Sequence, residues 1–269
     1  SHTLLPANIG AFSVCIGKIA NHPDTRPLPF SYVIGDGVST YVVPGKNITT
    51  VGLFRDITKW PRRDVRLPAS KKSVVNYDWL SPFTVGEVMK GRDLLAQMQE
   101  EQGQDAAEYM FNGCKISRKS LQRGLRLYNM AVEIFIGDVL ASRDFGDQCV
   151  PQGADEWSDL AGLLLPSVEE NRLAEKVKYG MLGSISSLVD MFSAYNDRYP
   201  DYLWAYTESL MRRYLGTDSL TEDDFTALRE RGAAARKAWL DEIRSDAEKE
   251  YRMGDIDRAV LDKFLSQLS

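Results

Sequence analysis

The hydrophobic pattern of this chain changes from short apolar runs to long helical stripes near residue 46. Before that point, apolar and β-branched residues gather at positions 12–16, 31–34 and 40–43. Gly35-Asp36-Gly37 separates the last two runs like a hairpin turn. The prolines that precede this hairpin lack an amide donor, which favours an irregular edge over a central strand. We therefore predict a small β unit over residues 1–45.

After this unit, apolar residues recur at steps of three and four, which predicts helices for the rest of the chain. Pro61 should end the first helix, and Thr84 with Glu87 has the spacing of a capping box at the start of the second. Thr221, followed by three acids, should cap a helix of about thirty residues. The predicted helices span residues 47–59, 84–101, 117–143, 167–179, 184–198, 200–214, 222–251 and 255–268.

The predicted fold class is mainly α, with the β unit at 1–45 followed by an α-helical, bundle-like domain at 46–269. The chain has 269 residues, of which 43% are apolar, and this is enough to bury a substantial core. No internal repeat of about 20 to 50 residues is visible, so a solenoid is not predicted.

Charge is unevenly distributed along the chain. Residues 1–72 carry ten bases and four acids, whereas the net charge of the whole chain is −5. Residues 46–72, the basic strip, hold eight bases and only Asp56 and Asp64 as acids. Planar cations and an indole in this strip could clamp a phosphate or a carboxylate. The candidate anion-binding residues are Arg55, Trp60, Arg62, Arg63 and Arg66.

A second interpretation of the basic strip is structural, and we favour it. In this interpretation the strip packs against the acidic remainder of the same chain, with Asp56 and Asp64 each holding an arginine. Binding of nucleic acid is disfavoured because the chain is acidic overall and the strip is short.

Standard catalytic and cofactor motifs are absent from the sequence. It contains no GxGxxG after a strand, no GxxxxGK[ST], no HExxH and no GxSxG. His2 and His22 are the only histidines, and the three cysteines have no CxxC spacing. The chain therefore has too few histidines and suitably spaced cysteines to favour a histidine-based triad or a zinc site. We predict no metal and no cofactor, and we name no catalytic residue.

Aromatic residues cluster between two of the predicted helices. A surface that stacks sugars is one interpretation, but a buried aromatic seam whose hydroxyls reach the surface is favoured. The residues of this cluster are Tyr195, Tyr199, Tyr202, Trp204, Tyr206 and Tyr214.

Other features of the sequence bear on its location. No apolar run approaches the roughly 18 residues that span a bilayer, so we expect no membrane association. The start lacks the regions of a signal peptide, and the odd, scattered cysteines favour reduced thiols. We expect a cytoplasmic protein. Ser1-His2 resembles the remnant of a tag, and we expect the natural chain to be longer.

The order of several short motifs resembles the C-terminal half of an uncharacterised family, domain-of-unknown-function family 4954. In the N-terminal part the resemblance rests on Arg26-Pro27-Leu28-Pro29-Phe30-Ser31, Val43-Pro44-Gly45, Leu53-Phe54-Arg55-Asp56, Arg63-Asp64-Val65-Arg66 and the stretch from Tyr77 to Val85. In the tail it rests on Asp159-Leu160-Ala161-Gly162, Trp204-Ala205-Tyr206 and the stretch from Asp246 to Tyr251.

This resemblance implies a context for the chain. Members of the family resemble trimeric LpxA-like proteins, in which a left-handed parallel β-helix precedes the region seen here. The stretch from Ile9 to Val14 fits one hexapeptide turn of such a helix, whereas Cys15-Ile16-Gly17 breaks the next. The resemblance therefore implies that the β unit forms the last coils of a β-helix and that the protein is a homo-oligomer, a trimer.

Three functional hypotheses follow. The leading one is a non-catalytic helical module that packs on the β-helix domain of a sugar-modifying protein. The alternative is a part of a transferase that uses a sugar nucleotide or acyl-coenzyme A, with the arginines of the basic strip holding phosphates. The third is binding of nucleic acid, which requires affinity that falls steeply with salt.

Overall fold

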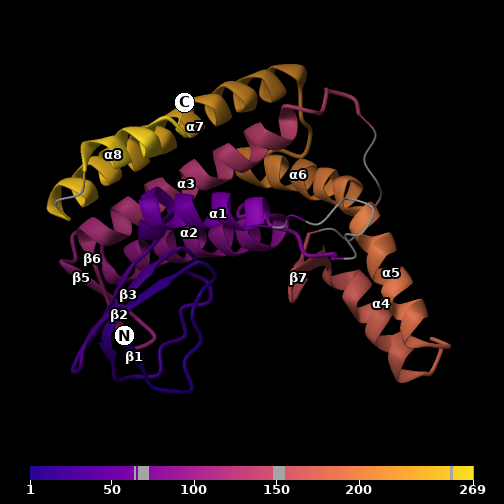
Figure 1. Cartoon of the computed structure of the whole chain (residues 1–269), viewed down its shortest axis with the longest axis horizontal. Helices are drawn as coiled ribbons and strands as arrows, with labels where there is room; N and C mark the ends of the chain where they lie inside the picture. The colour runs from indigo at the N-terminus through magenta and orange to yellow at the C-terminus, as the bar shows by residue number, and fades with distance from the viewer. Residues whose placement is uncertain (64, 66–72, 148–154, 255–256, 269) are drawn as a thin grey trace. The chain divides into compact units, whose positions relative to one another are not determined.

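A computed structural model of the chain describes residues 1–63, 65, 73–147, 155–254 and 257–268, apart from the side chain of Trp60. The described residues are mainly helical, with a small N-terminal sheet (Figure 1), which confirms the predicted fold class. Contacts divide the chain into two compact units, each assembled from separate segments. The first unit comprises residues 1–58, 87–134 and 231–269, and the second comprises 59–86 and 135–230. The predicted division after residue 45 stays a prediction.

The first unit contains a six-stranded sheet in the order β1-β2-β3-β4-β6-β5. Strands β1, β2 and β3 are parallel, β4 is antiparallel to β3, and β6 joins β4 in parallel before the antiparallel β5. Their bounds are β1 His2–Thr3, β2 Val14–Ile19, β3 Tyr32–Asp36, β4 Thr40–Val43, β5 Glu108–Phe111 and β6 Cys114–Ser117.

The predicted hairpin is confirmed, because β3 and β4 pair with Tyr32 opposite Val43. The strand predicted at 12–16 begins two residues later as β2. Gly17 of β2 pairs directly with Gly35 of β3, and a Cβ atom on Gly17 would lie 2.2 Å from the Gly35 carbonyl oxygen. Gly17 also has a φ of 76°, so glycine is required there for two independent reasons.

Two further hairpins were not predicted from the sequence. The turn between β5 and β6 is Asn112-Gly113, with φ angles of 48° and 74°. The turn between β7 (Trp157–Leu160) and β8 (Leu163–Pro166) is Ala161-Gly162, with φ angles of 54° and 100°. Two consecutive left-handed residues match the twist of paired strands, and Asn-Gly is a strong signal for such a turn. The sequence therefore held a usable signal for the first hairpin.

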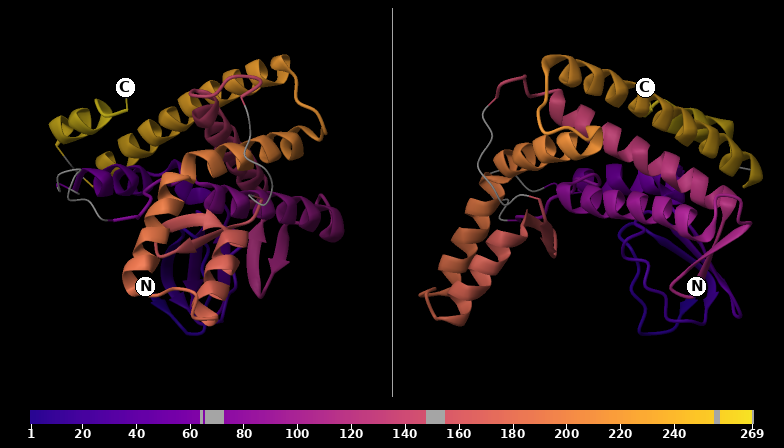
Figure 2. Two further views of the ribbon diagram at one scale, coloured as in Figure 1. Left: turned by 90° about the vertical axis from the view of Figure 1, so that its right-hand side faces the viewer. Right: turned by 180° about the vertical axis from the view of Figure 1, so that it is seen from behind.

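Within the described residues the α-helices follow the predicted order but differ at several ends. In the first unit, α2 and α3 run above the sheet, and α7 and α8 lie on the far side of these helices (Figure 1, Figure 2). In the second unit, α4 and α5 run side by side in opposite directions (Figure 1). The bounds are α1 Val51–Arg63, α2 Pro82–Gln102, α3 Arg118–Leu140, α4 Ser167–Lys178, α5 Ile185–Asp197, α6 Tyr199–Leu215, α7 Glu222–Met253 and α8 Arg258–Leu265.

The beginning of the helical region differs from the prediction. A short 3-10 helix, Lys46–Thr49, precedes α1, and Pro61 lies inside α1 rather than ending it. Proline removes one helical hydrogen bond, but only two residues of α1 follow it. At α2 the cap lies three residues earlier than predicted, at Ser81 instead of Thr84. The Ser81 amide donates to Thr84 Oγ1 at 2.8 Å, and the Thr84 amide donates to Ser81 Oγ at 3.3 Å.

The predicted cap at Thr221 is confirmed, since its hydroxyl accepts a hydrogen bond from the Asp224 amide at 3.2 Å. The Thr221 amide in turn donates to the Asp224 carboxylate at 2.9 Å, which completes a reciprocal capping box.

Helix α1 is held at its N-terminus by residues of the distant helix α7. The first turn of α1 contains no acid, and the Val51 amide donates to the Asp246 carboxylate at 3.1 Å. Asp246 also lies 3.8 Å from Lys46 Nζ. Trp239, which lies seven residues before Asp246 on α7, donates its indole N–H to the Ile48 carbonyl at 2.7 Å. These bonds fix the junction between the sheet and the helices of the first unit.

We predict that Asp246→Ala lowers the free energy of unfolding by about 0.5 to 2 kcal/mol, because the Val51 amide loses its acceptor. Asp246→Asn should cost less, since one acceptor oxygen remains. Urea unfolding measures both values. The control is Asp241→Ala, which removes an exposed carboxylate of the same helix that pairs along α7 with Lys237 and Arg244. Equal stability of the Asp246→Ala and Asp241→Ala variants would contradict the capping role.

Candidate functional site

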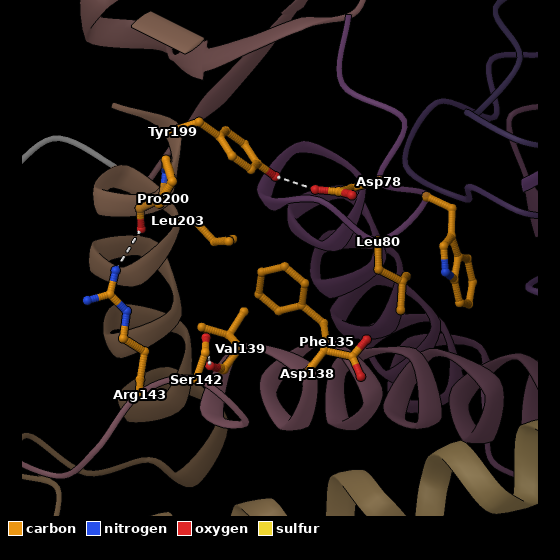
Figure 3. Close-up of a pocket in the computed structure, with 11 residues that line it drawn as sticks. Asp78, Leu80, Phe135, Asp138, Val139, Ser142, Arg143, Tyr199, Pro200 and Leu203 are labelled. Atoms are coloured by element: carbon orange, nitrogen blue, oxygen red, sulfur yellow. Dashed lines mark hydrogen bonds between the residues drawn. The ribbon is translucent and has the colours of Figure 1, made fainter. Parts of the chain in front are cut away.

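The second unit contains a cavity of about 310 Å³. Three segments that are distant in the sequence line it: the residues just before α2, the last turns of α3 with the residues that follow it, and the first turn of α6 (Figure 3). The lining residues are Asp78, Trp79, Leu80, Phe135, Asp138, Val139, Ser142, Arg143, Tyr199, Pro200 and Leu203.

Local bonds hold the first of these segments in place. The Asp78 amide donates to Asn76 Oδ1 at 2.6 Å, which makes an Asx turn, and the Asn76 amide donates to the Gly162 carbonyl at 2.8 Å. The turn presents Asp78 to the cavity just before the Ser81 cap starts α2. The position of this carboxylate therefore depends on the β7–β8 hairpin as well as on its own turn.

Tyr199 and Asp78 form the clearest polar contact of the cavity. The Tyr199 hydroxyl donates to the Asp78 carboxylate at 3.3 Å (Figure 3). Burial of the phenol, and then the negative charge of Asp78, raise the pKa of Tyr199 far above its usual value. The phenol is therefore neutral at physiological pH and acts as a hydrogen-bond donor to the carboxylate.

Arg143 and the apolar residues of the lining do not take part in the contact between Tyr199 and Asp78. Arg143 Nη2 donates to the Pro200 carbonyl at 3.4 Å, and its guanidinium lies 5.7 Å from the centre of the Trp204 ring. Phe135 and Val139 are buried and form the apolar wall between Arg143 and Asp78 (Figure 3). The cavity thus offers carboxylates, a fixed phenol and an apolar surface, which can bind a small molecule but do not form a recognisable catalytic triad.

The aromatic cluster noted in the sequence lies beside this cavity in the second unit. The Trp157 ring makes edge contacts with Tyr199, Tyr202 and Tyr206 at centroid distances of 5.7, 6.5 and 6.3 Å. The residues of the cluster that are buried are Tyr195, Tyr202, Trp204 and Tyr206. This agrees with a buried seam rather than a surface that stacks sugars.

A buried carboxylate anchors the seam. Glu169 is 9% exposed, accepts a hydrogen bond from the Tyr202 hydroxyl at 3.2 Å and pairs with Arg172 at 2.8 Å. Burial, and then the charge of Glu169, raise the pKa of Tyr202 to about 12. An ionised Tyr202 would place a second negative charge beside the Glu169 carboxylate. The folded state therefore favours the neutral phenol.

Arg55, Arg62 and Arg63 all lie on α1, which the boundary between the two units crosses after Thr58. Arg55 belongs to the first unit and pairs with Asp56 at 3.8 Å, with both side chains more than half exposed. Arg62 and Arg63 are exposed in the last turn of α1, in the second unit, where cations offset the helix dipole. Arg63 also interacts within the chain. Arg66, Asp64 and the side chain of Trp60 lie outside the described residues.

The cavity itself was not predicted from the sequence. Asp78 and Trp79 entered only as part of a family motif, and Asp138 reads as an ordinary polar position of an amphipathic helix. Within the described residues, no group of three His, Cys, Asp or Glu side chains is placed to hold a metal ion. No described helix combines the length and the apolar character that crossing a bilayer requires.

Comparison with known families places the N-terminal part of the chain. Residues 1–99 match the model of a family described as a domain of unknown function, DUF4954. The match supports the resemblance of this part of the chain to that family. The match includes all the N-terminal motifs on which the resemblance rests, and it also includes Asp78, Trp79 and Leu80 of the cavity.

The C-terminal part of the chain matches a different family model. Residues 148–256 match a second model, described as a domain of unknown function, DUF6819. The C-terminal motifs that resembled the DUF4954 family lie inside this second match. The cavity therefore combines residues of the DUF4954 region with Tyr199, Pro200 and Leu203 of the DUF6819 region. No curated protein and no solved structure matches the chain.

We predict that stability falls as the pH rises above about 10, because the unfolded chain then releases tyrosine protons that the folded chain retains. Tyr202 contributes to this fall between its usual pKa of 10.0 and its folded value of about 12. Tyr202→Phe should make the fall shallower, by at most one proton or roughly 1.4 kcal/mol per pH unit.

The same variant should cost about 1 to 3 kcal/mol at neutral pH, since Glu169 loses a hydrogen bond. Urea unfolding at a series of pH values measures both effects. Tyr179→Phe is the control, because Tyr179 is 64% exposed. A Tyr202→Phe slope equal to that of the wild type would show that the phenol does not titrate differently on folding.

Proposed function

We propose that this chain is a non-catalytic helical module that closes the end of a β-helix domain in a sugar-modifying protein. The observation that carries the proposal is the spacing of the parallel pairs in the first unit. Thr3 pairs with Ile19 and Asn8 with Asp24, an offset of 16 residues in each case. Val14 pairs with Tyr32, an offset of 18 residues. An offset near 18 is the length of about three hexapeptides, the repeat of a β-helix coil.

The two edges of this parallel ladder differ, so a preceding coil of the β-helix can pair at one edge and not at the other. Beyond β3 the ladder ends, because β4 is antiparallel and the β5–β6 hairpin follows it. On the other side β1 is an edge strand. The Leu4 amide donates inward to the Ile19 carbonyl at 3.2 Å. Neighbouring amides of a strand point in opposite directions, so the Thr3 amide points outward. Exposed edges of this kind accept a further strand.

In the parent protein, a preceding coil would pair with β1, and the helices of the first unit would cover the end of the β-helix. We include homo-oligomerisation as a trimer in the proposal, because the resemblance that led to it implies trimeric relatives. The parent protein, not this module, would then carry the sugar chemistry.

We predict that the Thr3 amide exchanges rapidly with solvent in this chain and becomes protected when the natural preceding segment is present. Amide exchange followed by NMR or mass spectrometry of both proteins measures this. The Val14 amide is the internal control, because it donates to the Ser31 carbonyl at 2.8 Å and should be protected in both proteins. Rapid Thr3 exchange in the longer protein would overturn the proposed stacking.

A second candidate is favoured by the exposure of Arg62 and Arg63. In this alternative the module completes a transferase site, and these arginines, with Arg55 and Arg66, hold the phosphates of a sugar nucleotide or of coenzyme A. Both residues are exposed, although Arg63 also interacts within the chain. Their position in the last turn of α1 also accounts for them structurally, so the module remains the leading proposal.

A thermal-shift panel separates the candidates. For the module we expect no shift with sugar nucleotides, coenzyme A thioesters or inorganic phosphate. A ligand at a hundred times its Kd would stabilise a binding protein by about 2.7 kcal/mol, which is readily detected. A saturable shift that falls with salt and disappears in the Arg62→Ala, Arg63→Ala double variant would favour the transferase.

The control for this panel is a Lys237→Ala, Arg258→Ala double variant, which removes two cations whose side chains are 83% and 73% exposed. A shift lost equally in both double variants would indicate non-specific attraction to charge. A shift with short oligonucleotides that falls steeply with salt would instead indicate nucleic-acid binding.

A further inference from the structure

We propose that the cavity of the second unit is a binding site for a small organic molecule that carries a protonated amine and an apolar body. The inference is independent of the module proposal, which rests on the sheet of the first unit. The carrying observation is the cavity together with the separation of its charged and apolar walls.

The size of the cavity suits a small molecule. Its volume of about 310 Å³ lies at the lower end of the range for ligand sites, roughly 300 to 1,000 Å³. A molecule with one aromatic ring and a short chain fits this volume, whereas a nucleotide sugar with two phosphates would need more space and more cations.

The apolar wall offers contacts to the body of such a ligand. Phe135, Val139 and Leu80 are 3%, 9% and 8% exposed, and Leu203 faces the same space from α6 (Figure 3). Burial of ligand surface against these side chains contributes roughly 25 cal/mol per Å² of apolar area before the cost of association. Apolar contact alone does not select a charge, so the polar wall must do so.

The polar wall favours a cation. In Figure 3 Phe135 and Val139 separate Arg143 from the carboxylate of Asp78, and the Asp138 carboxylate lies below Leu80. These three are the ionisable residues of the lining besides the neutral Tyr199, so two negative charges face one positive charge. An amine beside the carboxylates gains a charge-assisted hydrogen bond, whereas a ligand carboxylate there would be repelled.

Asp78 is the principal partner of the amine. Tyr199 donates to it at 3.3 Å and thereby orients the carboxylate without neutralising it. Asp138 already interacts within the chain, and Arg143 is directed to the Pro200 carbonyl and the Trp204 ring. Trp79 also lines the cavity.

Three probes of one shape and different charge test the proposal. They are 2-phenylethylamine, which is cationic at neutral pH, 2-phenylethanol, which is neutral, and 3-phenylpropionate, which is anionic. Binding to the whole chain is measured by calorimetry, and NMR identifies the residues whose signals move. We expect the amine to bind at least about tenfold more tightly than either analogue, and signals of the cavity residues to move.

Two variants and a control locate the site. Asp78→Asn keeps an acceptor for Tyr199 but removes the charge, and it should weaken binding of the amine by about tenfold or more. Leu203→Trp should fill the cavity and abolish binding, with circular dichroism confirming that the variant is folded. Asp190→Asn is the control, because Asp190 is an exposed acid of α5 that does not line the cavity.

Several outcomes would overturn the proposal. These are no saturable binding of the amine up to about 10 mM, equal binding of the three probes, and retained affinity for the amine in Asp78→Asn. None of them bears on the exchange of the Thr3 amide, so failure here is distinguishable from failure of the module proposal.

Discussion

The structure of the first unit depends on which groups accept hydrogen bonds from the first backbone amides of α1. The first amides of a helix have no partner within the helix, and leaving them unpaired inside a protein is costly. Thr50 accepts from the Leu53 amide at 3.2 Å, and Asp246 accepts from the Val51 amide at 3.1 Å. The second acceptor comes from a residue 195 positions away. The start of α1 therefore forms correctly only when α7 is in place.

Further contacts of α7 connect the start of α1 to the other elements of the first unit. Trp239 donates to the Ile48 carbonyl from the same helix as Asp246, and its ring lies 5.8 Å from the Phe54 ring. Phe54 in turn makes an edge contact with Phe264 of α8 at 5.7 Å. On the sheet side, buried Tyr128 of α3 donates to the Pro29 carbonyl at 2.9 Å. Polar bonds thus fix the positions of the elements, and the aromatic residues fill the space between them.

Periodicity was sufficient to predict the helices, because an amphipathic stripe is a local property of the sequence. The capping signal at Thr221 predicted the start of α7 correctly. At α2, Ser81 and not Thr84 begins the cap. Pro61 misled the prediction, because a proline near the end of a helix removes a single bond. The Asn112-Gly113 turn was recognisable, whereas Ala161-Gly162 was not, since alanine rarely adopts a positive φ.

The two candidate sites differ in how far apart their residues lie in the sequence. Arginines close together in the sequence suggested an anion site, and this site stays a prediction: Arg55 pairs with Asp56, and Arg62 and Arg63 are exposed on the same helix. The cavity has the opposite property, because Asp78, Asp138 and Tyr199 are far apart in the sequence and lie around one space. Two of these residues come from separate family matches, and Asp138 lies between the matches. Such a site exists only when both matched regions and α3 are folded together. Its ligand chemistry must therefore be read from the charges and apolar surfaces that the fold assembles, and not from a motif.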